Sequence, residues 1–220
     1  MNDSRELILG RIRERLGRSE ANAPAAGAVI DATLAARAPG PRPPAEVAPQ
    51  SLLAAFRARS EALASTVDEV ATLADVPRAI AAYLAERQLA PRAVCVPDLA
   101  GLDWRGAGIE VEARAAVDRD LVGITGCFRA IAETGTLMLC SGPASPATVS
   151  LLPETHIAVA TAPTIIAGME EAWAAARAVF GQLPRSVNFI SGPSRTGDIE
   201  QTIVLGAHGP YRVHIVIVRG

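Results

Sequence analysis

Between positions 50 and 220 the apolar residues follow two kinds of pattern, one typical of helices and one typical of strands. These patterns alternate along the chain and predict alternating helices and strands. Spacings of three and four residues predict helices over 51–64, 75–88 and 163–180. Residues 120–126 are predicted to form a short helix or turn. Short apolar runs predict strands at 65–67, 92–96, 109–113, 129–133, 136–140, 156–160, 186–190 and 211–218.

Strands that alternate with helices favour an α/β fold, in which a sheet lies between layers of helices. The strands at 129–133 and 136–140 are separated only by Thr134 and Gly135, so they are expected to pair as an antiparallel hairpin. The predicted fold class is therefore a three-layer α/β domain with a mixed sheet.

Residues 1–17 have the pattern of an amphipathic helix. Asp3 or Ser4 can cap its first turn, and Gly17 can end it. The pattern leaves open whether this helix docks on its own domain or serves as an arm for a partner subunit. Its apolar face contains Leu7, Ile8, Ile12 and Leu16.

Residues 18–49 consist largely of Ala, Pro and Gly, including the run P-G-P-R-P-P at 39–44. Such a segment has few large apolar groups to bury, so we expect a flexible, partly extended linker. Residues 50–220 then form the α/β domain.

Composition excludes several classes of function. Half of the 220 residues are hydrophobic, which is enough for a substantial core. The net charge is -2 and no basic run occurs, so nothing predicts nucleic-acid binding. No apolar stretch reaches membrane-spanning length, and the N-terminus is charged rather than signal-like, so we expect a cytoplasmic protein.

Cysteine and histidine spacing gives no metal pattern. Cys95, Cys127 and Cys140 are too far apart for an iron–sulfur or structural zinc motif, and we predict no metal and no cofactor. The histidines also lack paired spacing. His156 and His214 lie in apolar strands and are expected to be structural.

The stretch from 188 to 210 carries the richest set of polar groups, and we expect the working site there, at the carboxyl edge of the sheet. Arg195 offers a fork that matches a carboxylate or phosphate. The segment lacks Gly-Lys-Ser/Thr, and Pro193 removes one N–H, so a small anion fits better than ATP. Alternatively, Arg195 pairs with Asp198 or Glu200 for structure alone. The predicted substrate-binding residues of this loop are Ser191, Gly192, Ser194, Arg195, Thr196, Asp198 and Glu200.

Two further residues are candidates for proton transfer. Glu133 would act as a base beside the hydroxyl donors Thr134 and Thr136, while Gly135 would let the backbone approach a ligand. The alternative is a hairpin turn with a solvated glutamate. His208 lies in the Gly-rich run 206–210 and could reach into a cleft, or simply cap a tight turn.

Three motifs resemble the LUD-domain family. They are A-I-A-E-T-G-T-L at 130–137, L-P-E-T-H-I at 152–157, and S-G-P-S-R-T-G-D-I-E at 191–200 with G-A-H-G-P at 206–210. The resemblance implies a fold similar to the ribose-phosphate isomerase and CoA-transferase-like group. In CoA-transferase-like folds a glutamate near such a turn is a nucleophile, and extending that role to Glu133 is an analogy of fold.

The resemblance also implies a function in the oxidation of L-lactate to pyruvate, together with iron–sulfur partner proteins. The first hypothesis is a subunit that binds a small carboxylate or phosphate. A second is a non-catalytic assembly subunit for the iron–sulfur partners. A third is an independent enzyme on a CoA ester or sugar phosphate.

Overall fold

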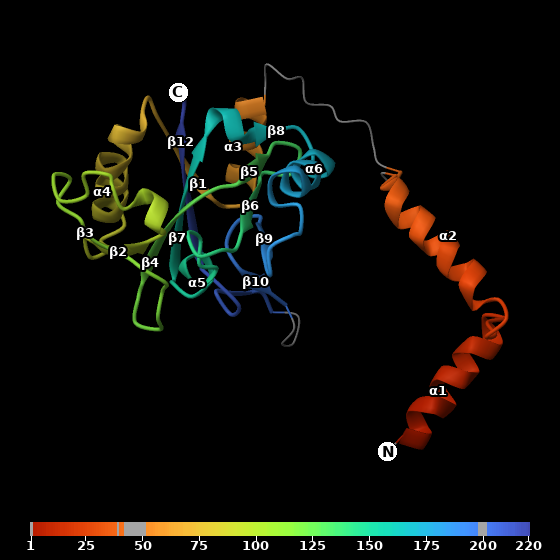
Figure 1. Cartoon of the computed structure of the whole chain (residues 1–220). Helices are drawn as coiled ribbons and strands as arrows, with labels where there is room; N and C mark the ends of the chain where they lie inside the picture. The colour runs from red at the N-terminus through yellow and green to blue at the C-terminus, as the bar shows by residue number, and fades with distance from the viewer. Residues whose placement is uncertain (1, 39, 42–51, 198–201) are drawn as a thin grey trace. The chain divides into compact units, whose positions relative to one another are not determined.

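The computed structural model describes residues 2–38, 40–41, 52–197 and 202–220 (Figure 1). The chain divides into two units, Met1–Pro43 and Pro44–Gly220.

The first unit contains two helices, α1 (Asn2–Arg15) and α2 (Ala23–Ala36). Helix α1 lies within residues 1–17, for which the sequence predicts a helix. The extended conformation expected over 18–49 is wrong for α2. Alanine has the highest helix propensity, and Pro24 lies in the first turn, where its missing N–H costs nothing. Residues 42–51 lie outside the described residues.

The second unit is built on a six-stranded parallel sheet with the order β1-β12-β7-β4-β2-β3. Its central strands are buried on both faces, which explains their nearly continuous apolar sequences. The strands are β1 (Thr66–Val70), β2 (Arg92–Cys95), β3 (Glu110–Ala113), β4 (Val122–Gly126), β7 (Thr155–Thr161) and β12 (Arg212–Val218).

A second sheet of four strands has the order β8-β5-β6-β9. Strands β5 and β6 pair antiparallel, as expected, β6 and β9 are also antiparallel, and β5 and β8 are parallel. Its strands are β5 (Arg129–Ile131), β6 (Thr136–Cys140), β8 (Ile165–Ile166) and β9 (Val187–Ile190). A further pair of short strands, β10 (Arg195–Thr196) and β11 (Val204–Leu205), forms a small hairpin.

Helices and the second sheet cover the two faces of the parallel sheet. On one face, Ile80 and Leu84 of α4 (Val76–Glu86) pack with Ile124 and Ile157. On the other face, α3 (Leu52–Ala62) and the second sheet share a core. Helix α6 (Met169–Phe180) packs on the outer side of the second sheet. The predicted α/β class, with helices that flank the sheet, is confirmed. The short helices are α5 (Thr148–Leu151), η2 (Leu73–Asp75), η3 (Pro97–Leu99) and η4 (Ala162–Thr164).

Two predicted elements are wrong. Residues 120–126 are not a helix or turn, because Val122–Gly126 forms the buried strand β4. A Cβ at Gly123 would lie 2.0 Å from the carbonyl oxygen of Val149, so glycine is required where α5 crosses the strand. The helix predicted from 163 begins only at Met169, because Ile165 and Ile166 pair with β5 as strand β8.

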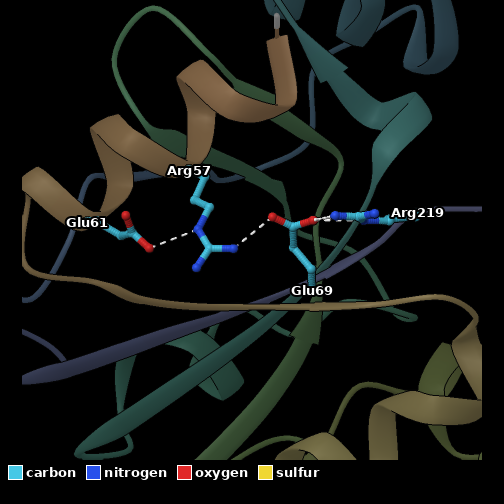
Figure 2. Close-up of polar contacts among 4 residues, drawn as sticks. All are labelled: Arg57, Glu61, Glu69 and Arg219. Carbon is cyan, nitrogen blue, oxygen red and sulfur yellow. Dashed lines mark hydrogen bonds and ion pairs between the residues drawn. The ribbon is translucent and has the colours of Figure 1, made fainter.

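An ion-pair network ties α3, β1 and the end of the chain together (Figure 2). Glu69 of β1 accepts a hydrogen bond from Arg57 Nη1 of α3 at 2.8 Å and another from Arg219 Nε at 2.8 Å. Arg57 Nε also donates to Glu61 at 2.9 Å. Both arginines depress the pKa of Glu69, with Arg57 contributing most.

Candidate functional site

The predicted site loop lies at the amino edge of the parallel sheet, not at the carboxyl edge. Strand β9 does not belong to the parallel sheet, and Ile190 at its end pairs with Leu137 near the start of β6. Ser194 N donates to Pro210 O at 2.8 Å, just before β12 begins. In Figure 1 the carboxyl edge is the upper one, where the label C marks the end of the chain, and β10 lies near the lower edge.

A chain of hydroxyl groups joins two of the sequence motifs. Thr134 Oγ1 donates to Thr136 Oγ1 at 2.8 Å, and Thr136 Oγ1 shares a hydrogen bond with Ser191 Oγ at 2.7 Å. Thr136 and Ser191 are 55 positions apart and meet because β6 and β9 are neighbours. The two motifs are therefore parts of one local structure.

Gly135 and Gly192 allow this structure to contact the end of α3. Gly135 has a φ of +64°, and a Cβ there would lie 2.6 Å from the backbone nitrogen of Ser60. Gly192 has a φ of +80°, and a Cβ there would lie 2.2 Å from the carbonyl oxygen of Leu63. In both positions the close approach is to protein backbone, which differs from the expected approach to a ligand at Gly135.

Glu133 holds the start of α6. Its Oε1 accepts a hydrogen bond from Met169 N at 2.8 Å, and its own N–H donates to Ala167 O at 3.1 Å. A carboxylate at a helix N-terminus satisfies an unpaired donor and interacts favourably with the helix dipole. This contact accounts for one carboxylate oxygen of the predicted base.

Ser194 and His208 are in contact at the surface, and the exposed Arg195, next to Ser194 in the sequence, contacts the end of α3. Arg195 Nη2 donates to Leu63 O at 3.3 Å, and Ser194 Oγ accepts from His208 N at 3.3 Å. His208 lines an open hollow of about 370 Å³, beside Tyr211, whose hydroxyl donates to Glu154 at 2.7 Å. Thr196 follows Arg195 in β10.

The structure thus forms two groups from the predicted residues. One is the Thr134–Thr136–Ser191 hydroxyl chain, and the other is Ser194 with His208. Among the described residues, no hydrogen bond or ion pair joins Glu133 to Arg195 or to His208. Asp198 and Glu200 lie outside the described residues.

The other two histidines are buried in the parallel sheet. His156 Nε2 shares a hydrogen bond with Thr125 Oγ1 at 2.8 Å, and His214 Nδ1 shares one with Thr66 Oγ1 at 2.8 Å. Burial lowers the pKa of each ring to about 4. Within the part of the chain that the structure describes, no three His, Cys, Asp or Glu residues are grouped so that they could hold a metal ion.

Sequence reasoning missed an open cavity of about 520 Å³ at the carboxyl edge. Asp98 follows β2, and Cys127, Phe128 and Arg129 follow β4 at the entrance to β5. The run G-C-F-R at 126–129 would have indicated it, had 122–126 been read as a buried strand with polar groups at its carboxyl end.

None of the helices in the described ranges has both the length and the apolar character needed to cross a bilayer.

Comparison with known proteins gives a consistent set of relatives. A family model described as the LUD domain matches residues 53–218. "Lactate utilization protein C" of Shouchella clausii is 41% identical over 99 residues, which is 44% of this chain and 43% of that protein. "Lactate utilization protein C" of an Exiguobacterium species is 36% identical over 120 residues, 53% of this chain and 52% of that protein. The chain therefore spans about half the length of the curated relatives it matches.

A solved structure has a similar fold. The crystal structure of a DUF162 family protein from Deinococcus radiodurans matches with a TM-score of 0.58 and 27% sequence identity. The match covers 78% of this chain and 99% of that one.

Proposed function

The chain belongs to the LUD domain family, and on that premise we propose that it is a subunit of a lactate-utilisation system that binds a small carboxylate. The observation that carries this proposal is the similarity to curated proteins named lactate utilization protein C. Oxidation of L-lactate to pyruvate is the reaction that the subunit would serve.

Arg195, next to the pair formed by Ser194 and His208, is our candidate for the carboxylate site. A guanidinium has several N–H donors in one plane and binds a carboxylate through two of them. The contact of Arg195 Nη2 with Leu63 O anchors the side chain against the end of α3. His208, held beside Ser194, supplies an imidazole for proton transfer from the substrate hydroxyl.

Thermal unfolding against L-lactate, pyruvate, phosphate and CoA tests the proposal. A ligand at about a hundred times its dissociation constant adds roughly 2.7 kcal/mol, which raises the Tm by roughly 5–11 °C for a domain of this size. We expect a shift with L-lactate or pyruvate that is lost in Arg195→Gln. Arg185→Gln removes an exposed arginine elsewhere and is the matched control.

An Arg195→Gln protein that retains the full lactate shift contradicts the assignment. A shift with CoA alone favours an independent enzyme on a CoA ester.

Glu133 can be tested separately as a base. Glu133→Gln keeps an oxygen that can accept the Met169 N–H but cannot take a proton. If Glu133 is the base, the variant loses turnover in the assembled system and keeps the wild-type Tm. Unchanged turnover restricts Glu133 to its contact with α6.

A second candidate function is that of an assembly subunit for iron–sulfur partner proteins. The observation that favours it is the exposure of large apolar residues on both N-terminal helices. Deletion of residues 1–43 is then expected to abolish co-purification with those partners while residues 44–220 stay folded. Undiminished co-purification counts against this function. The exposed residues are Leu7, Ile8, Ile12 and Leu16 with Val29, Ile30 and Leu34.

A further inference from the structure

The cavity at the carboxyl edge lies where the order of the parallel strands reverses. The chain passes from β2 to its neighbour β3 on one side, but from β4 to β7 and then to β12 on the other. Strands β2 and β4 are adjacent. The connection from β2 to β3 and the connection from β4 to β7 therefore lead away from the gap between these two strands in opposite directions. In open α/β sheets the crevice at such a reversal, outside the carboxyl ends of the strands, is where ligands bind.

This cavity is far from the motif loops. Thr136, in the hydroxyl chain, begins β6, and Cys140, which lines the cavity, ends it. At about 3.4 Å per residue the two ends of β6 are roughly 14 Å apart. The cavity is therefore a separate place from the proposed carboxylate site at Arg195.

Its size suits a larger molecule than lactate. The volume of about 520 Å³ falls within the range of roughly 300–1,000 Å³ that is typical of sites for organic ligands. A small hydroxy acid fills only roughly 100 Å³, judged from the ~30 Å³ that one water takes in the liquid.

One wall of the cavity is aromatic. Phe128, between β4 and β5, and Phe180, at the end of α6, have ring centroids 5.3 Å apart with their planes tilted by 43°. Phe180 is 40% exposed, so its ring offers a face to a bound molecule. Leu139 adds apolar surface from β6. Flat conjugated rings pack well against such a surface.

The positive charge in the cavity comes from Arg129, and the lining also includes the exposed carboxylate of Asp98. Its Nη1 donates to Phe128 O at 2.6 Å, and its guanidinium carbon lies 4.5 Å from the centre of the Phe128 ring. The side chain is half-buried, and among the described residues no carboxylate pairs with it. These contacts fix the cation beside the aromatic wall, where an anionic group of a ligand would complete its hydrogen bonds.

The thiol beside Arg129 does not supply a nucleophile. Cys127 Sγ donates to Arg129 O at 2.9 Å. Burial raises the pKa of this thiol to about 12, so it stays protonated at neutral pH. The surroundings favour reversible binding over covalent chemistry.

We propose that this cavity is a binding site for an organic anion with a flat aromatic or conjugated body. The anionic group pairs with the Arg129 guanidinium, and the ring system lies against Phe128 and Phe180. This site is additional to the carboxylate site at Arg195 and does not depend on it.

Isothermal titration of the full chain with 2-naphthoate tests the proposal. We expect a dissociation constant below about 1 mM, which corresponds to about -4.1 kcal/mol. Arg129→Gln should weaken binding at least tenfold, and Arg129→Lys, which keeps the charge, should restore part of it. The neutral isostere 2-naphthamide should bind wild type and Arg129→Gln alike. Phe180→Ala, at an exposed position, should weaken naphthoate binding even if the Arg129 variants do not fold.

Absence of naphthoate binding to the wild type overturns the proposal, as does equal affinity in a folded Arg129→Gln. The matched control is Arg195→Gln, which should bind naphthoate as the wild type does. The same variant should lose the lactate-dependent shift in Tm. The two proposals can therefore fail independently of each other.

Discussion

At the scale of single residues, Gly135 is a position in the motifs where only glycine fits. Its φ of +64° and the nearby backbone of Arg59 and Ser60 leave no room for a Cβ. Gly135→Ala is expected to lower the free energy of unfolding by about 2 kcal/mol or more, measured by urea denaturation. Gly101→Ala, where a Cβ meets nothing within 4 Å, should be close to neutral. Equal stability of the two variants would show that the contact with α3 is not rigid.

His214 should make the protein sensitive to mild acid. Its ring is buried, stacks on Tyr83 at 3.9 Å, and has a pKa lowered to about 4, first by burial and then by Arg87. Asp68 lies 3.7 Å from Nε2 of His214, but its side chain is 54% exposed and water screens its charge. The effect of burial on the pKa of His214 is therefore the larger one. Because the unfolded ring titrates near 6.5, the unfolded state binds more protons below that pH. The contribution to stability is full above about pH 6.5 and is lost as the pH falls toward 4.

The measurement is urea denaturation between pH 7.5 and 4.5. Removal of the titrating ring in His214→Gln should reduce the dependence of unfolding free energy on pH by up to about 1.4 kcal/mol per pH unit. The buried His156 contributes in the same direction and stays in place. A slope that survives in His214→Gln would assign the acid sensitivity to other groups.

At the scale of elements, Glu69 connects α3, β1 and the residues after β12 (Figure 2). Its side chain is only 13% exposed, so Glu69→Gln should cost about 1–3 kcal/mol of unfolding free energy at pH 7. The depressed pKa means that this stabilisation is present above the unfolded value of about 4.3 and is lost as the pH falls through the folded value. The difference between the variant and the wild type should therefore shrink toward pH 3.

Glu61→Gln is the control for this network. Glu61 is 46% exposed and pairs with Arg57 one helical turn away, so its loss should change stability by less than about 0.5 kcal/mol. A comparable loss in both variants would mean that Arg57, and not Glu69, is the centre of the network.

The local spacing of apolar residues was sufficient to predict most helices and strands. It failed where tertiary packing decides the structure of a segment. Strands β7 and β12 are apolar runs that any strand criterion finds. Strand β4 contains Gly123 and Gly126, which are typical of turns, yet Gly123 is needed for the close approach of α5. The motif residues could be identified from the sequence. Which edge of the sheet they lie at, however, depends on the antiparallel pairing of β9 with β6. That pairing is a long-range contact with no local signal.

At the scale of the whole molecule, the two units differ in what holds them together. The core residues all lie in the second unit, and α2 buries none of its residues. Removal of residues 1–43 should leave the Tm and the urea m-value of the remaining chain within error of the full-length protein, measured by circular dichroism. A Tm lower by more than about 4 °C, equivalent to roughly 1–2 kcal/mol, would show that the first unit stabilises the second.

The position of β12 also affects biosynthesis. Among the described strands of the domain β12 is the last in sequence order, yet it lies between β1 and β7, and Thr66 pairs with His214 across 148 residues of chain. Until β12 leaves the ribosome, a nascent chain therefore has two strands with unpaired backbone groups, which attract chaperones and aggregating partners. We predict that the domain becomes protease-resistant only once β12 has left the ribosome. Pulse proteolysis of chains stalled before and after β12 emerges measures this directly, and resistance in the chain that still lacks β12 would refute it.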